Sequence, residues 1–300
     1  MFTREKKIDC GDYREVDIIN RTDNAEQAAK GKRRKRHKVS APKQQELNDK
    51  NAKRYLVQLG NGNFGKGDYH ITCTYAVLPE SVAAAEKRVQ RYLARIAYRR
   101  MVMGLEPLKY ILVTEYKYTK DGTAIRRVHH HIIVNGGIDR DLLELMWTDT
   151  RINWRRVDNP DYRDSIQRTG WCNVDRIQPN ENGIEALCKY VLKDPQGKKR
   201  WSSSRNLIRP EMLPPADKKY RPRQIENLVK SPDGGRAFFE KQYRDYHITH
   251  IEPVYYDETG WHVYLKMWRK QPRKKKKVSH GRKSKRSIKG RVELRKPGGP

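Results

Sequence analysis

The chain has 300 residues, of which 36% are hydrophobic and 34% are charged, and its formal net charge is +30. This length suits one catalytic domain with extensions, or two small domains. So large a positive charge repels itself unless a polyanion binds, and it therefore favours a nucleic acid as partner. A membrane surface is the weaker alternative, because the sequence shows no lipidation signal, no basic amphipathic helix and no apolar run of about 20 residues.

The four cysteines lie far apart in the sequence, at Cys10, Cys73, Cys172 and Cys188. None belongs to a Cys-x-x-Cys pair, which argues against a zinc finger or zinc ribbon. The polar N-terminus does not have the pattern of a signal peptide. We therefore expect reduced thiols in a cytoplasmic protein.

Both ends of the sequence are polar and basic. Residues 1–54 contain a basic run from Lys30 to Lys38, and residues 269–300 contain 15 Lys/Arg and one acidic residue, a net charge of +14. Blocks of like charge are usually solvated. We expect two flexible, disordered basic extensions that bind a polyanion, with the folded part between them.

Periodicity of the apolar residues predicts the elements between these extensions. In chain order they are a strand at 69–75, a helix from Pro79 to about Met103, strands at 109–118 and 127–135 around an Asp-Gly turn, a short helix at 139–147, a strand at 170–177 and a helix at 182–193. A polar connector, a helical stretch near 225–243 and a strand at 260–268 follow. This order predicts an α+β fold with an antiparallel β-sheet flanked by helices.

Three consecutive histidines occupy one predicted strand. His129 and His131 point to the same face of it, and His130 points to the other. A turn near Gly122 places Glu115 across from His129, although a one-residue change of register would reverse its face. These nitrogen and oxygen donors suit Mn²⁺ or Mg²⁺. The alternative is a His-rich strand whose side chains are partly exposed.

Tyr190 and Lys193 are three residues apart on a predicted helix, away from its apolar face, so their side chains are neighbours on the surface. A metal that withdraws charge from a phosphate, together with an adjacent ammonium group, favours attack by the phenolate. Taken alone, an aromatic side chain that packs on a neighbour and a solvated lysine explain this pair better.

The order of these motifs resembles that of rolling-circle replication initiators of the HUH superfamily, and more narrowly of the plasmid- and phage-type proteins. The matching segments are Ile71-Thr72-Cys73-Thr74, Arg127 to Val134 around the histidines, and Ala186 to Lys193 around the tyrosine. The segment Trp201 to Leu207 resembles a serine-arginine stretch that follows the third motif in some of these proteins. The resemblance covers about half of the chain, from Tyr69 to Leu207.

The resemblance implies an HUH endonuclease domain with a ferredoxin- or RRM-like sheet. It implies that His129, His131 and Glu115 hold the metal and that Tyr190, assisted by Lys193, forms a 5′-phosphotyrosine link and leaves a free 3′-OH. The partners implied are single-stranded DNA at a replication origin and a host helicase and polymerase, in the cytoplasm of a bacterial host cell.

The chain departs from the family pattern at two places. The middle residue of the histidine motif is usually hydrophobic, so the direction of His130 is an open question. The positions one helical turn from Tyr190 hold Ala186 and Asp194 rather than a second tyrosine, which indicates a one-tyrosine mechanism.

Four segments are expected: a basic N-terminal extension at 1–54, the endonuclease domain at 55–209, an α/β extension at 210–268 and a basic tail at 269–300. A conjugative relaxase or an HUH transposase would use the same chemistry. A non-catalytic basic nucleic-acid binder is the alternative of another class.

Aromatic residues are dense among basic residues near the C-terminal end, at Tyr255, Tyr256, Trp261, Tyr264 and Trp268. Stacking on unpaired bases suits this pattern, and packing of a strand into the core explains it equally well. His247 and His250 lack an evident third ligand and are interpreted as solvated or structural.

Overall fold

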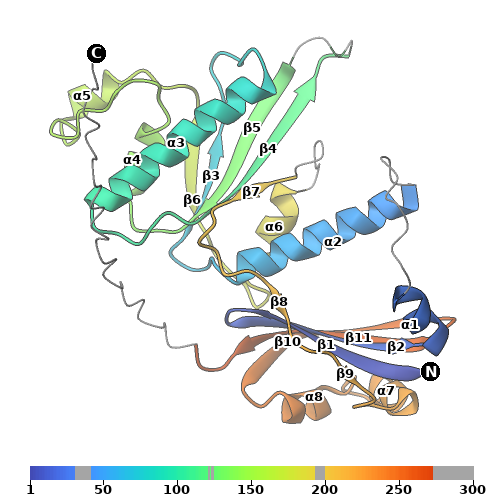
Figure 1. The fold of residues 1–300 in the computed structure, drawn as a ribbon. Coiled ribbons are helices and arrows are strands. Elements are labelled where there is room, and N and C mark those ends of the chain that lie inside the picture. Colours follow the sequence, from blue (N-terminus) through green and yellow to red (C-terminus); the bar gives the residue numbers. More distant parts are fainter. Residues whose placement is uncertain (31–41, 121, 123–124, 193–199, 273–300) are drawn as a thin grey trace, which may run out of the picture.

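The computed structural model describes residues 1–30, 42–120, 122, 125–192 and 200–272 (Figure 1). Within these residues the chain forms two antiparallel β-sheets and eight helices. The predicted α+β class with an antiparallel sheet is confirmed, but the prediction lacked the second sheet. No helix in the described ranges is both long and apolar enough to cross a membrane.

The central sheet has the strand order β6-β3-β5-β4-β7. Its strands are β3 (Tyr69–Cys73), β4 (Tyr110–Tyr118), β5 (Ile125–Val134), β6 (Cys172–Arg176) and β7 (Ser202–Ser203). Helices α3 (Val82–Val102) and α4 (Arg140–Leu145) pack on one face, and α2 (Pro42–Asn61) and α6 (Glu185–Val191) pack on the other. A short helix, α5 (Pro160–Asp164), lies in the connection between α4 and β6.

Helix α3 follows the sequence pattern closely. The Ser81 side chain accepts a hydrogen bond from the backbone N–H of Ala84 at 3.1 Å and so caps the first turn. Val89, Leu93 and Ile96 are buried against the central sheet, as the helical spacing predicts. This helix therefore closes the face of the sheet opposite α6.

The terminal sheet joins the two ends of the described chain. Its strand order is β10-β11-β2-β1-β8, with β9 also paired to β1. The strands are β1 (Phe2–Cys10), β2 (Tyr13–Arg21), β8 (Glu211–Met212), β9 (Ala216–Asp217), β10 (Tyr246–Tyr256) and β11 (Gly260–Arg269). Helices α7 (Pro222–Val229) and α8 (Arg236–Gln242) bury one face of this sheet, and the other face is turned toward α2 (Figure 1).

The expectation of a flexible extension over residues 1–54 is wrong for its described part. Residues 1–30 form β1, β2 and α1 (Asp23–Lys30), and the boundary expected at 54/55 falls inside α2. These strands look polar because they carry buried carboxylates. Glu5 is bound by Lys219, and Glu15 and Asp17 are bound by Arg54. Most of the basic run after Lys30, and residues 273–300 of the basic tail, lie outside the described residues.

The C-terminal segment also differs from its prediction. The helical stretch expected near 225–243 is divided between α7 and α8, because Asp233 and two glycines with positive φ, Gly234 and Gly235, interrupt it. Strand β10 was not predicted. It contains Pro253 and a register shift after Ile248, which an edge strand tolerates because one side of its backbone needs no partner.

Candidate active site

The β4–β5 hairpin places two of the predicted side chains opposite each other. Glu115 pairs with His129, as the turn predicts, and His131 lies two residues further along on the same face. The Glu115 Oε2 atom is 3.7 Å from Nε2 of His131. The ring centroids of His129 and His131 are 6.5 Å apart. The hairpin therefore gathers one carboxylate and two imidazoles on the face that α6 covers.

Glu115 and His131 lie close to the separation that a shared metal ion requires. Ligand atoms about 2.0–2.2 Å from one ion are about 3 Å from each other, slightly closer than this pair. His129 is turned away, because Nε of Arg127 donates a hydrogen bond to its Nε2 at 2.8 Å. Within the described ranges no three His, Cys, Asp or Glu side chains converge on one point. Glu115 and His131 fit an ion nearly as placed, and His129 fits it after its ring rotates.

His130 points into the core, which answers the question that the sequence left open. Its Nδ1 lies 3.0 Å from the Thr114 hydroxyl and its Nε2 lies 2.7 Å from the Tyr75 hydroxyl. Burial, and then the neighbouring His131 and His129, lower the pKa of His130 to about 3. A neutral, doubly hydrogen-bonded imidazole in this position anchors β5 and is not available as a ligand.

Helix α6 brings Tyr190 to the same face of the sheet as His131. The two rings are in edge-to-face contact with their centroids 5.6 Å apart. The helix buries Cys188 and Val191 against α2 and the sheet, whereas Tyr190 is 51% exposed. It is shorter than the helix expected over residues 182–193. Lys193 and Asp194 lie outside the described residues.

His70 belongs to this cluster and was missed by sequence reasoning. It lies on β3, and its ring is stacked on His131 with centroids 5.6 Å apart and 6.5 Å from the Tyr190 ring. Its Nε2 is buried with no hydrogen-bond partner among the described side chains and backbone. Burial, and then His131, lower the pKa of His70 to about 4. The available signal was its alternation with Thr72, whose hydroxyl is 3.5 Å from His131 Nδ1.

The segment after the third motif closes the edge of the central sheet. Ser202 and Ser203 form β7 and pair with β4. The Ser204 hydroxyl accepts a hydrogen bond from the backbone N–H of Tyr110 at 3.0 Å. The serines in this segment therefore support the strand that carries Glu115.

Comparison with known families adds to this geometry. Residues 68–195 match the model of the replication-associated protein family that is described by its members ORF2 and gene 2 protein. This segment, rather less than half of the chain, belongs to that family, and it includes Glu115, His129, His131 and Tyr190. No curated protein and no solved structure is significantly similar to the chain.

Proposed function

We propose that the chain is an HUH endonuclease that initiates rolling-circle replication of a plasmid, a phage or an integrated element. It nicks single-stranded DNA at an origin, with Tyr190 as the nucleophile. The observation that supports this most directly is the contact between Tyr190 and His131, with Glu115 3.7 Å from the same imidazole. The family of residues 68–195 supports a role in replication.

The reaction transfers a phosphate ester from DNA to the protein. The Tyr190 phenolate oxygen forms a bond to phosphorus, and the bond between phosphorus and the 3′-oxygen breaks. The phenol gives up one proton and the departing oxygen takes up one, so no net proton is consumed. The products are a 5′-phosphotyrosine and a 3′-OH that can prime synthesis. The exposure of Tyr190 leaves its hydroxyl open to a strand.

We propose Mn²⁺ or Mg²⁺ as cofactor, held by Glu115, His129 and His131. When bound, the ion would draw charge from the phosphate and favour attack on phosphorus. His131 and Glu115 would orient it beside Tyr190, and His129 would have to leave its hydrogen bond with Arg127. Lys193 is proposed to assist at the phosphate. With Ala186 one turn before Tyr190, a single tyrosine would perform each transfer.

Trapping of a covalent complex tests this function. Incubated with Mn²⁺ and single-stranded origin DNA, wild-type protein should yield a protein–oligonucleotide adduct that mass spectrometry maps to Tyr190. Tyr190→Phe keeps the ring against His131 and should form no adduct. Tyr98→Phe, at an exposed tyrosine on α3, is the matched control and should react like wild type. Chelation of the metal should abolish the adduct.

Failure of wild type to cut across several origin-like hairpins and metals would contradict the proposal and leave a non-catalytic DNA binder. A relaxase or a transposase would give the same adduct, so the adduct does not separate them from an initiator. Extension of the released 3′-OH in the presence of a host helicase and polymerase, the partners that we propose, would separate them.

A further inference from the structure

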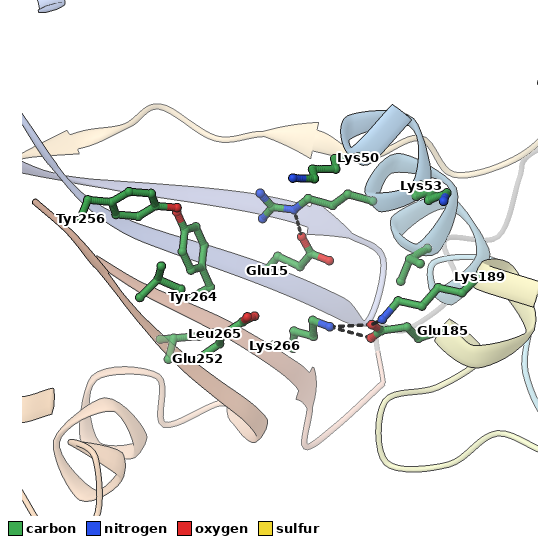
Figure 2. A pocket seen from close by; sticks show the side chains of 13 residues that line it. Glu15, Lys50, Lys53, Glu185, Lys189, Glu252, Tyr256, Tyr264, Leu265 and Lys266 are labelled. Atoms are coloured by element: carbon green, nitrogen blue, oxygen red, sulfur yellow. Dashed lines mark hydrogen bonds and ion pairs between the residues drawn. The ribbon is translucent and has the colours of Figure 1, made fainter. Parts of the chain in front are cut away.

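A groove separates the terminal sheet from α2 and α6 (Figure 2). It encloses about 500 Å³. Its floor is the face of the terminal sheet that α7 and α8 leave uncovered, and its walls carry lysines from both helices. The groove lies outside the cluster of Glu115, His131 and Tyr190, and neither the family motifs nor the proposed chemistry uses it.

The charges that line the groove leave an excess of cations. Five lining side chains are basic and three are acidic. The acidic side chains already have partners. Glu15 binds Arg54, Glu252 lies 3.7 Å from His250, and Glu185 is shared between two lysines, Lys189 and Lys266.

Lys50 and Lys53 extend from α2 at the groove (Figure 2). Neither forms an ion pair with a side chain in the described ranges. With two lysines sharing Glu185, they give the groove positive charge that no protein carboxylate neutralises. Such cations attract the phosphates of a nucleic acid.

The floor of the groove carries aromatic rings. Tyr256 and Tyr264 come from neighbouring strands and lie on the same face of the sheet (Figure 2). Tyr256 is 44% exposed, and the His262 ring beside it is 4.6 Å away, centroid to centroid. Trp261 points to the opposite face and packs on the apolar core. The two interpretations of the aromatic cluster thus apply to different residues, because Trp261 packs and Tyr256 faces the groove.

The groove leads to the candidate nucleophile. Lys189 and Tyr190 are consecutive on α6, and Lys189 lines the groove whereas Tyr190 contacts His131. From this continuity, the free cations and the aromatic floor, we infer that the groove binds the single-stranded DNA that flanks the nicked phosphate. Phosphates contact Lys50 and Lys53, and unpaired bases stack on Tyr256. This inference rests on the proposed function for the position of the scissile phosphate.

The aromatic floor favours single strands over a duplex. A base presents its π-face to a tyrosine only when it is unpaired, whereas lysines alone bind either form of DNA. Binding is therefore measured with a short oligothymidylate and with a duplex of the same length. A duplex that binds as tightly as the single strand and loses as much affinity in the groove variants would overturn the inference.

The first experiment removes the free cations. The full chain and its Lys50→Gln/Lys53→Gln variant are titrated with labelled oligothymidylate, without metal, at a series of salt concentrations. Each phosphate contact contributes about 0.7 to the slope of log K against log salt for a single strand, so the double variant should lower the slope by about 1.4. The control, Lys87→Gln/Arg91→Gln, changes two exposed cations on α3, across the central sheet, and should keep the wild-type slope. An unchanged slope in the groove variant would overturn the inference.

The second experiment tests the stacking. Tyr256→Phe keeps the ring and should bind oligothymidylate like wild type. Tyr256→Ala removes the ring and should weaken binding about tenfold. Thermal melting of each variant shows whether the fold is kept. Equal affinities of the two variants, with the fold intact, would contradict base stacking at this site.

The two proposals can fail separately, because binding is measured without metal and nicking with it. If wild type forms no adduct while the groove variants lose affinity, the nicking function fails and the groove is supported as a single-strand site. If wild type forms the adduct at Tyr190 while the groove variants bind normally, the groove inference is overturned and the nicking function stands.

Discussion

Three consecutive histidines on β5 have three different environments. His129 accepts a hydrogen bond from Arg127, His130 is enclosed between Thr114 and Tyr75, and His131 faces Glu115 and Tyr190. The alternation of a strand separates the middle residue from the outer two. One short motif thus supplies both an anchor in the core and the functional face of the hairpin.

Glu5 provides a residue-scale test of the terminal sheet. Burial raises the pKa of this carboxyl, but hydrogen bonds from Lys219 and Tyr243 outweigh burial, and the net pKa is lowered. A carboxyl whose folded pKa is lowered adds stability above its unfolded pKa of about 4.3 and loses it as the pH falls through the folded value. Glu5→Gln should therefore lower the free energy of unfolding by about 1–3 kcal/mol near pH 7.

Denaturant unfolding of wild type and Glu5→Gln over a pH series measures this. The difference between the two proteins should shrink as the pH falls below about 4.3, because both then carry a neutral side chain. Glu226→Gln, at an ion pair on the surface of α7, is the control and should change stability little at any pH. A difference that does not depend on pH would contradict the ionised state of Glu5.

The sequence predicted some residues of the candidate site and not others for a physical reason. Glu115 and His129 are joined by a short turn, so local register was enough to pair them. His70 reaches the same cluster because β3 lies next to β5 in the sheet, a neighbour relation that local periodicity does not contain. The roles of these residues stay predictions until the adduct is mapped.

At the scale of elements, α6 is held in place by a close approach to α2. A Cβ atom added at Gly60 would lie 2.5 Å from Cys188 Sγ and 3.1 Å from Ile184 Cδ1. Glycine therefore allows the two helices to meet at this point. Since Tyr190 is on α6, the spacing of these helices also sets the distance from Tyr190 to His131.

Gly60→Ala should displace α6. Overpacking of this kind costs about 1–3 kcal/mol, more than the roughly 1 kcal/mol that alanine contributes to helix propensity. We expect a lower melting temperature and slower adduct formation at Tyr190. Gly60→Ala/Cys188→Ala removes the clashing sulfur and should recover part of both losses. No recovery in the double variant, relative to Cys188→Ala alone, would show that the helix contact does not position Tyr190.

The elements that sequence reasoning found share clear periodicity. The β4–β5 hairpin and α3 were located to within a few residues. Strands β1 and β2 were missed because their carboxylates made the segment look solvated, and their cationic partners are distant in sequence. Strand β10 was missed because Pro253 is unfavourable inside a strand, and only its edge position makes it tolerable.

At the scale of the whole molecule, positive charge is concentrated beyond the described fold. Residues 273–300 contain 13 Lys/Arg and one Glu, a net charge of +12 out of +30. The basic tail was expected to begin at residue 269, but Arg269 ends β11 and the backbone N–H of Lys270 donates to Asp245 O. A truncation that spares the terminal sheet therefore begins at Arg273.

Removal of residues 273–300 should weaken DNA binding and flatten its dependence on salt, because fewer phosphates are neutralised. Adduct formation at saturating DNA should be kept, since the removed segment contains none of the proposed catalytic residues. Fluorescence anisotropy over a salt series and the adduct assay measure the two effects. An unchanged salt slope would show that the tail does not contact phosphates.

The pairing of β2 with β11 sets a condition on how the molecule assembles. Tyr13 lies opposite Trp268, so a strand made at the start of synthesis finds its neighbour only after nearly all of the described chain exists. Until then, apolar side chains such as Val16 and Ile18 lack their cover from β11 and α8. Contacts between such distant residues form slowly, and exposed strand edges favour aggregation. The nascent protein therefore depends on its last hairpin to finish the sheet that its first hairpin begins.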